Sequence, residues 1–175
     1  MTAVAWMVLP LVLAAACSRP ATGPDGALAP GETRTFEGTW LASGTRYTLQ
    51  LEPGHKTSIL RLTGSLLLTG ERGLGVGFQG EAIGISDTKT GGVGHAVWTD
   101  ERGDKVFSEL KGQPLGTGSR VVGTITGGTG RFAGVSGEYE LQWQYVIESD
   151  EGTISGRAVD LKGRVTAPVA NAPAR

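Results

Sequence analysis

Two histidines and two acidic segments are the residues of this chain whose types suit metal binding. His55 and His95 lie far apart in the sequence, and neither has a second histidine one helical turn away or a cysteine nearby. Their spacing favours turn or surface positions over a zinc site. Segments 87–92 and 100–104 contain aspartates but lack the alternating acidic positions and closing glutamate of a calcium loop. We therefore predict no metal site.

Nucleophilic and phosphate-binding motifs are also missing. The chain has no Gly-x-Ser-x-Gly elbow, and its single cysteine, Cys17, lies near the N-terminus. The glycine-rich segment 127–134 lacks the Lys-Ser or Lys-Thr pair of a phosphate loop, and a strand-like run follows it instead of a helix. The near balance of 16 basic and 17 acidic residues gives no basis for binding nucleic acid. We predict no catalytic residue, no cofactor and no nucleic-acid partner.

Large aromatic side chains are the remaining candidates for a functional site. Five of them lie in strand-like runs: Trp40, Phe78, Trp98, Trp143 and Tyr145. In a small barrel such side chains fill a packed core, because eight strands enclose little more than their own side chains. They can also line a cavity for one apolar ligand. The sequence leaves both interpretations open, and we take these five as candidate lining residues.

The elements that would position these aromatics are short strands. No segment between residues 34 and 165 shows a helical period, whereas glycine-punctuated β-rich runs recur. Short polar links, including one at residues 42–45, suggest hairpins. The pattern predicts an all-β, antiparallel domain of eight or nine strands, and closure into a barrel would remove exposed sheet edges. The runs are 35–41, 46–51, 59–68, 75–85, 94–98, 105–111, 120–126, 138–147 and 153–165.

The clearest alternation lies in segment 138–147. Its odd positions carry Tyr139, Leu141, Trp143, Tyr145 and Ile147, whereas its even positions carry mainly Glu and Gln. Successive side chains of a strand point to opposite faces, so we predict that the odd positions are buried and the even positions face water.

A glycine block precedes that run and predicts a tight, bulged corner between two strands. Glycine adopts backbone conformations with positive φ that other residues resist. The five glycines assigned to this corner are Gly127, Gly128, Gly130, Gly134 and Gly137.

Other glycines lie inside the predicted strands. Interior glycine weakens a strand, so it usually marks strong curvature or the close approach of another group. We therefore expect a small, tightly coiled barrel. The glycines concerned are Gly75, Gly77, Gly80, Gly84, Gly156 and Gly163.

The N-terminal segment resembles a bacterial lipoprotein signal. Residues 1–16 are uncharged and apolar but too short for a membrane-spanning helix, which needs about 20 residues. Leu13-Ala14-Ala15-Ala16-Cys17 is similar to a lipobox, although Ala14 replaces the usual leucine and no basic residue precedes the run. The resemblance implies a lipid attached to Cys17. A free thiol in an uncleaved anchor and a plain secretory peptide are the alternatives.

This resemblance sets the predicted organisation and location. We expect a signal peptide at 1–16, the lipidated cysteine and a flexible linker at 17–33, a barrel domain at 34–165 and a disordered tail at 166–175. Ser18 follows the cysteine instead of aspartate, which by the same resemblance implies an outer-membrane location facing the periplasm.

Segment 103–165 resembles the allene oxide cyclase-like barrels, which are related to plant dirigent proteins. The matching residues are Gly-Asp at 103–104, Phe-Ser-Glu-Leu-Lys-Gly at 107–112, the stretch from Val122 through Gly137, and Leu-Lys-Gly at 161–163. The resemblance implies an eight-stranded antiparallel barrel with a hydrophobic cavity, a trimeric assembly and no cofactor. The family's catalytic residues do not carry over, and Glu37 in the first predicted strand is better explained as an exposed side chain.

Two function hypotheses follow. In the first, a lipid-anchored envelope barrel binds a small hydrophobic ligand or serves as a non-catalytic interaction module. In the second, a cyclase-like or dirigent-like enzyme holds a hydrophobic substrate in the barrel and acts mainly by orienting it. The missing catalytic motifs favour the first hypothesis, and the sequence does not decide whether the chain is an enzyme.

Overall fold

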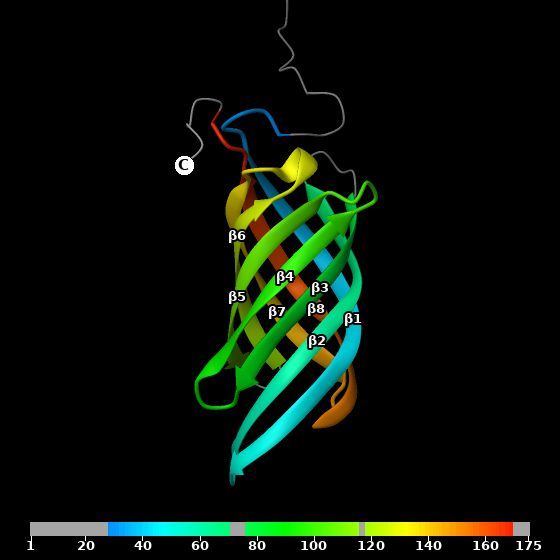
Figure 1. Ribbon diagram of the computed structural model, residues 1–175, viewed down its shortest axis with the longest axis vertical. Coiled ribbons are helices and arrows are strands. Elements are labelled where there is room, and N and C mark those ends of the chain that lie inside the picture. Colours follow the sequence, from blue (N-terminus) through cyan, green and yellow to red (C-terminus); the bar gives the residue numbers. More distant parts are fainter. Residues whose placement is uncertain (1–27, 71–75, 116–117, 170–175) are drawn as a thin grey trace, which may run out of the picture.

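The computed structural model describes residues 28–70, 76–115 and 118–169, which form one closed antiparallel barrel of eight strands (Figure 1). This confirms the predicted fold class. Each strand pairs with its neighbours in sequence, and β1 pairs with β8 to close the sheet. The strands are β1 (Thr33–Glu52), β2 (His55–Gly70), β3 (Val76–Asp87), β4 (Gly91–Asp100), β5 (Lys105–Leu115), β6 (Gly118–Gly128), β7 (Ser136–Ile147) and β8 (Glu151–Thr166).

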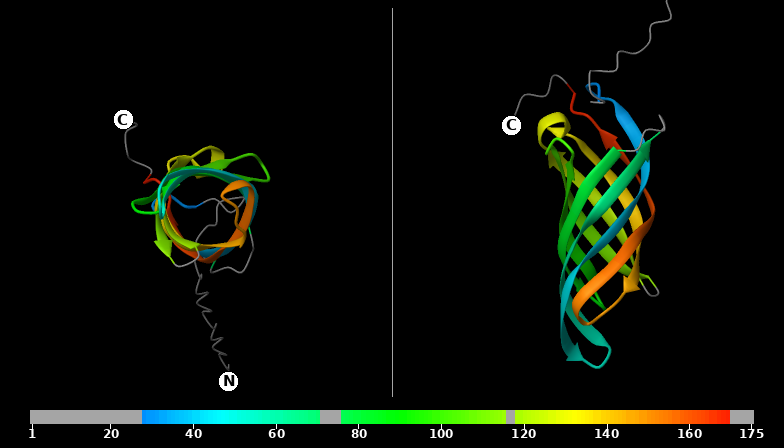
Figure 2. Two further views of the ribbon diagram at one scale, coloured as in Figure 1. Left: turned by 90° about the horizontal axis from the view of Figure 1, so that it is seen from below. Right: turned by 90° about the vertical axis from the view of Figure 1, so that its right-hand side faces the viewer.

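The two ends of the barrel differ. At the end that we call the hairpin end, β1 turns into β2, β3 into β4 and β7 into β8. At the other end, the terminal end, the first and last described residues lie side by side (Figures 1 and 2). There the Gly31 N–H donates to the Pro168 carbonyl and the Ala167 N–H donates to the Glu32 carbonyl. β8 includes Thr166, and Ala167 is buried. The first two residues of the predicted tail, 166–175, thus belong to the folded domain.

The hairpin link predicted at residues 42–45 is wrong. β1 runs without interruption from Thr33 to Glu52, and these residues pair with β2 on one side and β8 on the other. A Cβ atom added to Gly44 would lie 1.8 Å from the Arg61 carbonyl oxygen. The glycine thus serves the close approach of two coiled strands, and a short polar segment that contains it mimics a turn.

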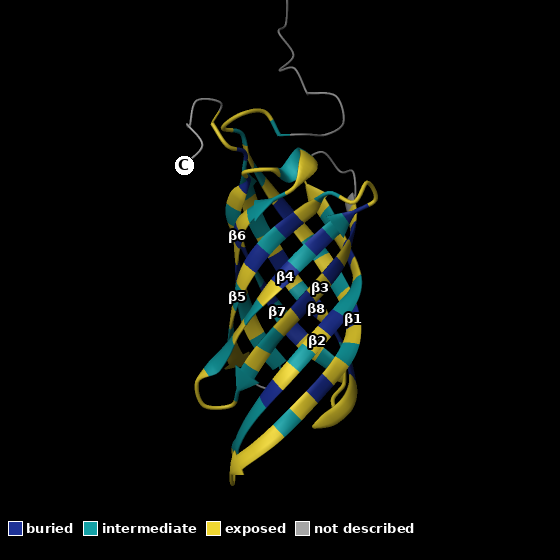
Figure 3. Ribbon diagram, viewed as in Figure 1, coloured by how far each residue is buried: buried dark blue, intermediate teal, exposed yellow. Residues whose placement is uncertain are grey.

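The alternation predicted in β7 is confirmed up to Tyr145. Tyr139, Leu141 and Trp143 are buried inside the barrel, whereas Glu138 and Glu140 pair with basic residues of neighbouring strands on the outside. Buried and exposed positions alternate along the strands of the barrel (Figure 3). The assignment of Ile147 to the buried face is wrong, because Ile147 is half exposed. The pairing register with β8 shifts between Tyr145 and Ile147, which changes the side to which the side chain points.

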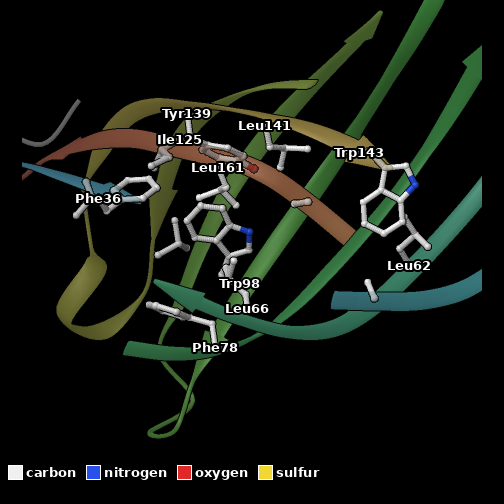
Figure 4. Close-up of a cluster of buried hydrophobic side chains, with 14 of the residues drawn as sticks. Phe36, Leu62, Leu66, Phe78, Trp98, Ile125, Tyr139, Leu141, Trp143 and Leu161 are labelled. Atoms are coloured by element: carbon white, nitrogen blue, oxygen red, sulfur yellow. The ribbon is translucent and has the colours of Figure 1, made fainter. Parts of the chain in front are cut away.

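Aromatic side chains fill the terminal half of the barrel (Figure 4). The Trp98 ring lies 4.7 Å from the Tyr139 ring and 6.1 Å from the Phe36 ring, centroid to centroid. Phe78 packs against Trp98 at 6.2 Å and against Phe132 at 5.8 Å. These distances are typical of favourable aromatic pairs, so this half of the interior is a packed core.

Several inward-facing glycines make room for aromatic rings inside the barrel, including those of Tyr139, Trp40 and Trp143. An added Cβ atom would lie 2.1 Å from Tyr139 Cζ at Gly123, 2.8 Å from Trp40 Nε1 at Gly80 and 2.6 Å from Trp143 Cζ2 at Gly156. Each ring therefore lies directly on a glycine of another strand, which is the close packing that interior glycine indicates.

The glycine block forms the connection from β6 to β7. Gly130 has φ +53° and Gly134 has φ +73°, and a short 3-10 helix, η2 (Gly130–Phe132), lies at this corner. An added Cβ atom at Gly130 would lie 1.7 Å from Asp104 Oδ1. Both backbone conformation and space therefore require glycine at position 130.

A buried ion pair joins this corner to the turn between β4 and β5. Asp100 Oδ2 lies 2.7 Å from Arg131 Nη2, and Asp100 Oδ1 accepts the N–H groups of Arg102 and Asp104 at 2.8 and 2.9 Å. Burial alone would raise the pKa of Asp100. The two N–H groups and the guanidinium outweigh burial and lower this pKa below its ordinary value.

Candidate ligand-binding site

The half of the barrel nearer the hairpin end contains a cavity of about 140 Å³. Its lining reaches that end through Asp87 and Gln113, and it ends against Trp98 and Tyr139 of the packed core. The other inward-facing side chains of its lining are mainly apolar: Trp40, Leu60, Leu62, Leu66, Ala82, Ala96, Leu110, Val121, Leu141, Trp143, Tyr145 and Leu161.

Three neighbouring strands present glycine to this cavity. Gly84 of β3 pairs with Gly94 of β4, and Gly92 of β4 pairs with Gly112 of β5. All four glycines line the cavity. No atom lies closer than 3.9 Å to a Cβ atom added at Gly112. Here backbone forms the wall and no aromatic ring occupies the space above it, in contrast to Gly80, Gly123 and Gly156.

Four of the five aromatic residues proposed from the sequence line this cavity. They are Trp40, Trp98, Trp143 and Tyr145, and the Trp40 and Trp143 rings lie 5.4 Å apart. The fifth, Phe78, belongs to the packed cluster at the terminal end and is not part of the lining. The interior is thus both a packed core and a cavity, one in each half.

Sequence reasoning missed several lining residues, of which Tyr139 is the largest. It follows the same alternation as Trp143, so its inward position was predicted but its place beside a cavity was not. Burial raises the pKa of the Tyr139 phenol to about 12, and the neighbouring Ser108 hydroxyl opposes this rise. Tyr139 therefore stays protonated at neutral pH, which suits a hydrogen-bond donor better than a base.

Polar atoms without a well-formed hydrogen bond in the described part of the chain include Ser108 Oγ and Trp143 Nε1, which are both buried. Trp40 Nε1, in contrast, donates to the Gly64 carbonyl at 3.3 Å. Trp143, whose indole N–H has no partner among the described residues, is also one of the residues that line the cavity.

Among the residues that the structure describes, the inner end of the cavity is lined by Trp98 and Tyr139 and by no carboxylate. Among residues 28–70, 76–115 and 118–169, the buried charged side chains are Arg46 and Asp100. Asp100 belongs to the ion pair at the terminal end, and Glu37 is exposed on β1. An acid or base for a cyclase-like reaction would need an inward-facing ionisable group at the cavity, and among the described residues Tyr139 is such a group there.

Charged side chains connect the loops of the hairpin end. His55 Nε2 lies 2.8 Å from Asp87 Oδ2 and His55 Nδ1 lies 3.4 Å from Glu52 Oε1, while Lys56 Nζ lies 2.6 Å from Asp150 Oδ2. The N–H of Thr90, the His55 ring and the N–H of Lys89 lower the pKa of Asp87 well below its ordinary value. His55 thus lies at the start of β2, directly after the turn from β1, and His95 lies on the outer face of β4.

The described residues contain no group of three or more His, Cys, Asp or Glu side chains suited to a metal ion. Nor do they include a helix with the length and apolar character needed to cross a membrane. The chain matches no protein-family model and no curated protein. The barrel agrees with the fold that the allene oxide cyclase-like resemblance implies, and membership of that family stays a prediction.

Proposed function

We propose that this barrel binds a small hydrophobic molecule inside its hairpin half. The observation that carries the proposal is the division of one interior into a packed half and an apolar half that holds a cavity. A barrel of eight strands normally fills its interior with its own side chains. Space maintained by four inward-facing glycines, and lined by three tryptophans, is what a ligand site requires.

The size of the cavity limits the ligand. A volume of about 140 Å³ is close to that of an engineered apolar cavity, roughly 150 Å³, that binds benzene. Pockets for drug-sized molecules are larger, about 300–1,000 Å³. The site therefore suits a single ring or a short alkyl chain, and any larger ligand would extend beyond the hairpin end.

Toluene is a suitable probe, because Trp40, Trp98 and Trp143 line the cavity and report on its occupancy. We expect toluene to change the tryptophan fluorescence of the full chain in a saturable way. The variant Gly112→Leu places a side chain in the free space beside Val121, so the dissociation constant for toluene should rise at least tenfold. The control Thr124→Leu lies on the exposed outer face of β6 and should bind toluene like the parent.

The same titration separates the hypotheses. Loss of binding in Gly112→Leu alone supports a ligand site. Equal binding in both variants would show that toluene binds elsewhere, and absence of saturable binding to the parent would favour an interaction module. The cyclase-like or dirigent-like alternative requires turnover of a bound hydrophobic substrate, and the lack of a carboxylate at the inner end of the cavity makes it the weaker candidate.

The lipid anchor, the cellular location and the assembly are further proposals. Lipidation of Cys17, an outer-membrane location facing the periplasm and a homotrimer rest on resemblance, and Cys17 lies outside the described residues. Intact-mass spectrometry of the protein purified from its membrane fraction tests the anchor, because residues 1–16 should be missing and a lipid present. Light scattering on the purified protein tests the trimer.

A further inference from the structure

We propose that Arg46 binds the anionic group of the ligand, so that the ligand is an amphipathic organic anion with a ring or short alkyl body. This inference rests on the proposed function, because it assigns a chemical class to the molecule in the same cavity. It derives from three features of Arg46: its burial, its incomplete hydrogen bonding and its contact with a residue that lines the cavity.

Arg46 points into the barrel. Its side chain is 9% exposed, and it occupies the inward-facing positions of β1 together with Trp40 and Ala42. Its cross-strand partner in β2 is Leu60, which lines the cavity. A guanidinium keeps its charge at all physiological pH values, and a buried charge is costly unless partners compensate it.

The protein compensates this charge only in part. Arg46 Nη1 donates to Glu148 Oε1 at 3.2 Å and to the Ser149 carbonyl at 3.4 Å. Arg46 Nε is buried and has no hydrogen-bond partner among the described residues. Glu148 is 54% exposed and therefore well hydrated. A guanidinium presents donors in a planar fork that matches a carboxylate, so an anion that reaches Nε would complete its bonding.

Tyr145 connects this guanidinium to the cavity. Arg46 Cζ lies 4.6 Å from the centre of the Tyr145 ring, which is a cation–π contact. The Tyr145 ring lies 5.9 Å from the Trp143 ring, and both rings line the cavity. A ligand whose apolar body contacts Trp143 and Tyr145 therefore has the Arg46 cation next to it, at the hairpin end of the barrel.

A purely structural role for Arg46 makes a different prediction. In that case the pair with Glu148 serves only to fix the hairpin between β7 and β8, and loss of either partner would have the same effect. If Arg46 binds ligand, Glu148 competes with the ligand anion for the guanidinium. Removal of Arg46 and removal of the Glu148 charge should then change anion affinity in opposite directions.

Matched pairs of phenylalkanoates and phenylalkanols test the proposal, from benzoate and benzyl alcohol to 4-phenylbutyrate and 4-phenylbutanol. The series varies the distance between ring and carboxylate. At the best length, the full chain should bind the carboxylate at least tenfold more tightly than the alcohol. Arg46→Gln should abolish this preference and retain alcohol binding, whereas Glu148→Gln should tighten carboxylate binding severalfold. Thermal melts verify that both variants fold.

The outcomes are distinct. Equal affinity for carboxylate and alcohol at every length, or a preference that survives Arg46→Gln, would overturn the role of Arg46 and leave the hydrophobic site intact. Failure of both classes to bind the parent would overturn the proposed function itself. If Arg46→Gln does not fold, the Glu148→Gln variant decides: weaker or unchanged carboxylate binding contradicts the proposal.

Discussion

Asp100 and Arg46 are the two buried charged residues of the described structure, and their surroundings differ. The Asp100 carboxylate has two backbone N–H donors and a guanidinium, so its charge is well compensated inside the protein. Arg46 has one half-exposed carboxylate, one carbonyl and the face of the Tyr145 ring. The groups around Asp100 lie within the protein, which indicates a structural role, whereas Arg46 lies next to residues that line a cavity, where a ligand can reach it.

Substitution of Asp100 should destabilise the protein. Asp100→Asn removes the charge beside Arg131 and leaves the guanidinium without its carboxylate. We expect the free energy of unfolding at pH 7 to fall by roughly 2–3 kcal/mol, below the upper range for buried pairs because the Arg131 side chain is 19% exposed. Urea denaturation measures the change. The exposed Asp150→Asn is the control and should unfold like the parent.

The same pair makes stability depend on pH. The pKa of Asp100 is lower in the folded state than in the unfolded chain, so the unfolded chain binds the proton first as the pH falls. The stability that this carboxylate contributes is present above about pH 4 and is lost as the pH falls through the lowered pKa. The difference between parent and Asp100→Asn should therefore narrow at acidic pH. A constant difference from pH 7 to pH 3 would contradict this assignment.

At the scale of elements, the corner between β6 and β7 depends on its glycines. We expect Gly130→Val and Gly134→Val each to lower the free energy of unfolding by about 3 kcal/mol, because a β-branched residue is strongly disfavoured at the positive φ of both positions. Calorimetry should show melting temperatures lower by roughly 10 °C. Gly77→Val is the control, since nothing lies within 4 Å of an added Cβ atom there. A parent-like melting temperature for both corner variants would show that glycine is not required.

The elements also show what could be predicted from the sequence. β7 was readable because large apolar and polar residues alternate from Tyr139 to Tyr145. β1 was not, because a segment containing Gly44 has the composition of a turn while its backbone continues as a coiled strand. Arg46 was overlooked, although it shares the even-numbered face of β1 with Phe36 and Trp40. The even residue number that Arg46 shares with Phe36 and Trp40 is the signal from which its inward position can be predicted.

The cavity could not be predicted, because it depends on pairing between strands. The register places Gly84, Gly92, Gly94 and Gly112 side by side on the inner face of three strands, and an added Cβ atom at Gly112 would meet free space. Gly80 and Gly123 are also interior glycines, but an aromatic ring covers each of them. A single sequence shows that glycine is abundant but not which glycines face a ring and which face space.

At the scale of the whole molecule, closure depends on the pairing of β1 with β8. Thr33 pairs with Thr166 at the end of this seam, and their hydroxyl oxygens lie 2.8 Å apart. The double variant Thr33→Cys/Thr166→Cys should form a disulfide that encloses most of the domain. We expect a stabilisation of about 4 kcal/mol, because a long loop loses much conformational entropy in the unfolded state. Melting curves with and without a reductant measure this effect.

Two results would contradict that expectation. If the disulfide forms but the melting temperature does not rise, β1 and β8 are already apart at this position in the native protein, or the disulfide strains their pairing. Failure of the two thiols to react under oxidising conditions would show that β1 and β8 do not meet there. The single variant Thr33→Cys controls for pairing of a new thiol with Cys17.

The first and last described residues lie beside the aromatic core, at the end of the barrel away from the cavity. Whatever is joined to residue 28 or residue 169, whether a lipid, an affinity tag or a chip surface, therefore leaves the entrance facing the bulk solution. The cavity would then exchange ligand with the bulk solution and not with the membrane or surface to which the protein is attached. Immobilisation through either terminus should accordingly preserve access to the site.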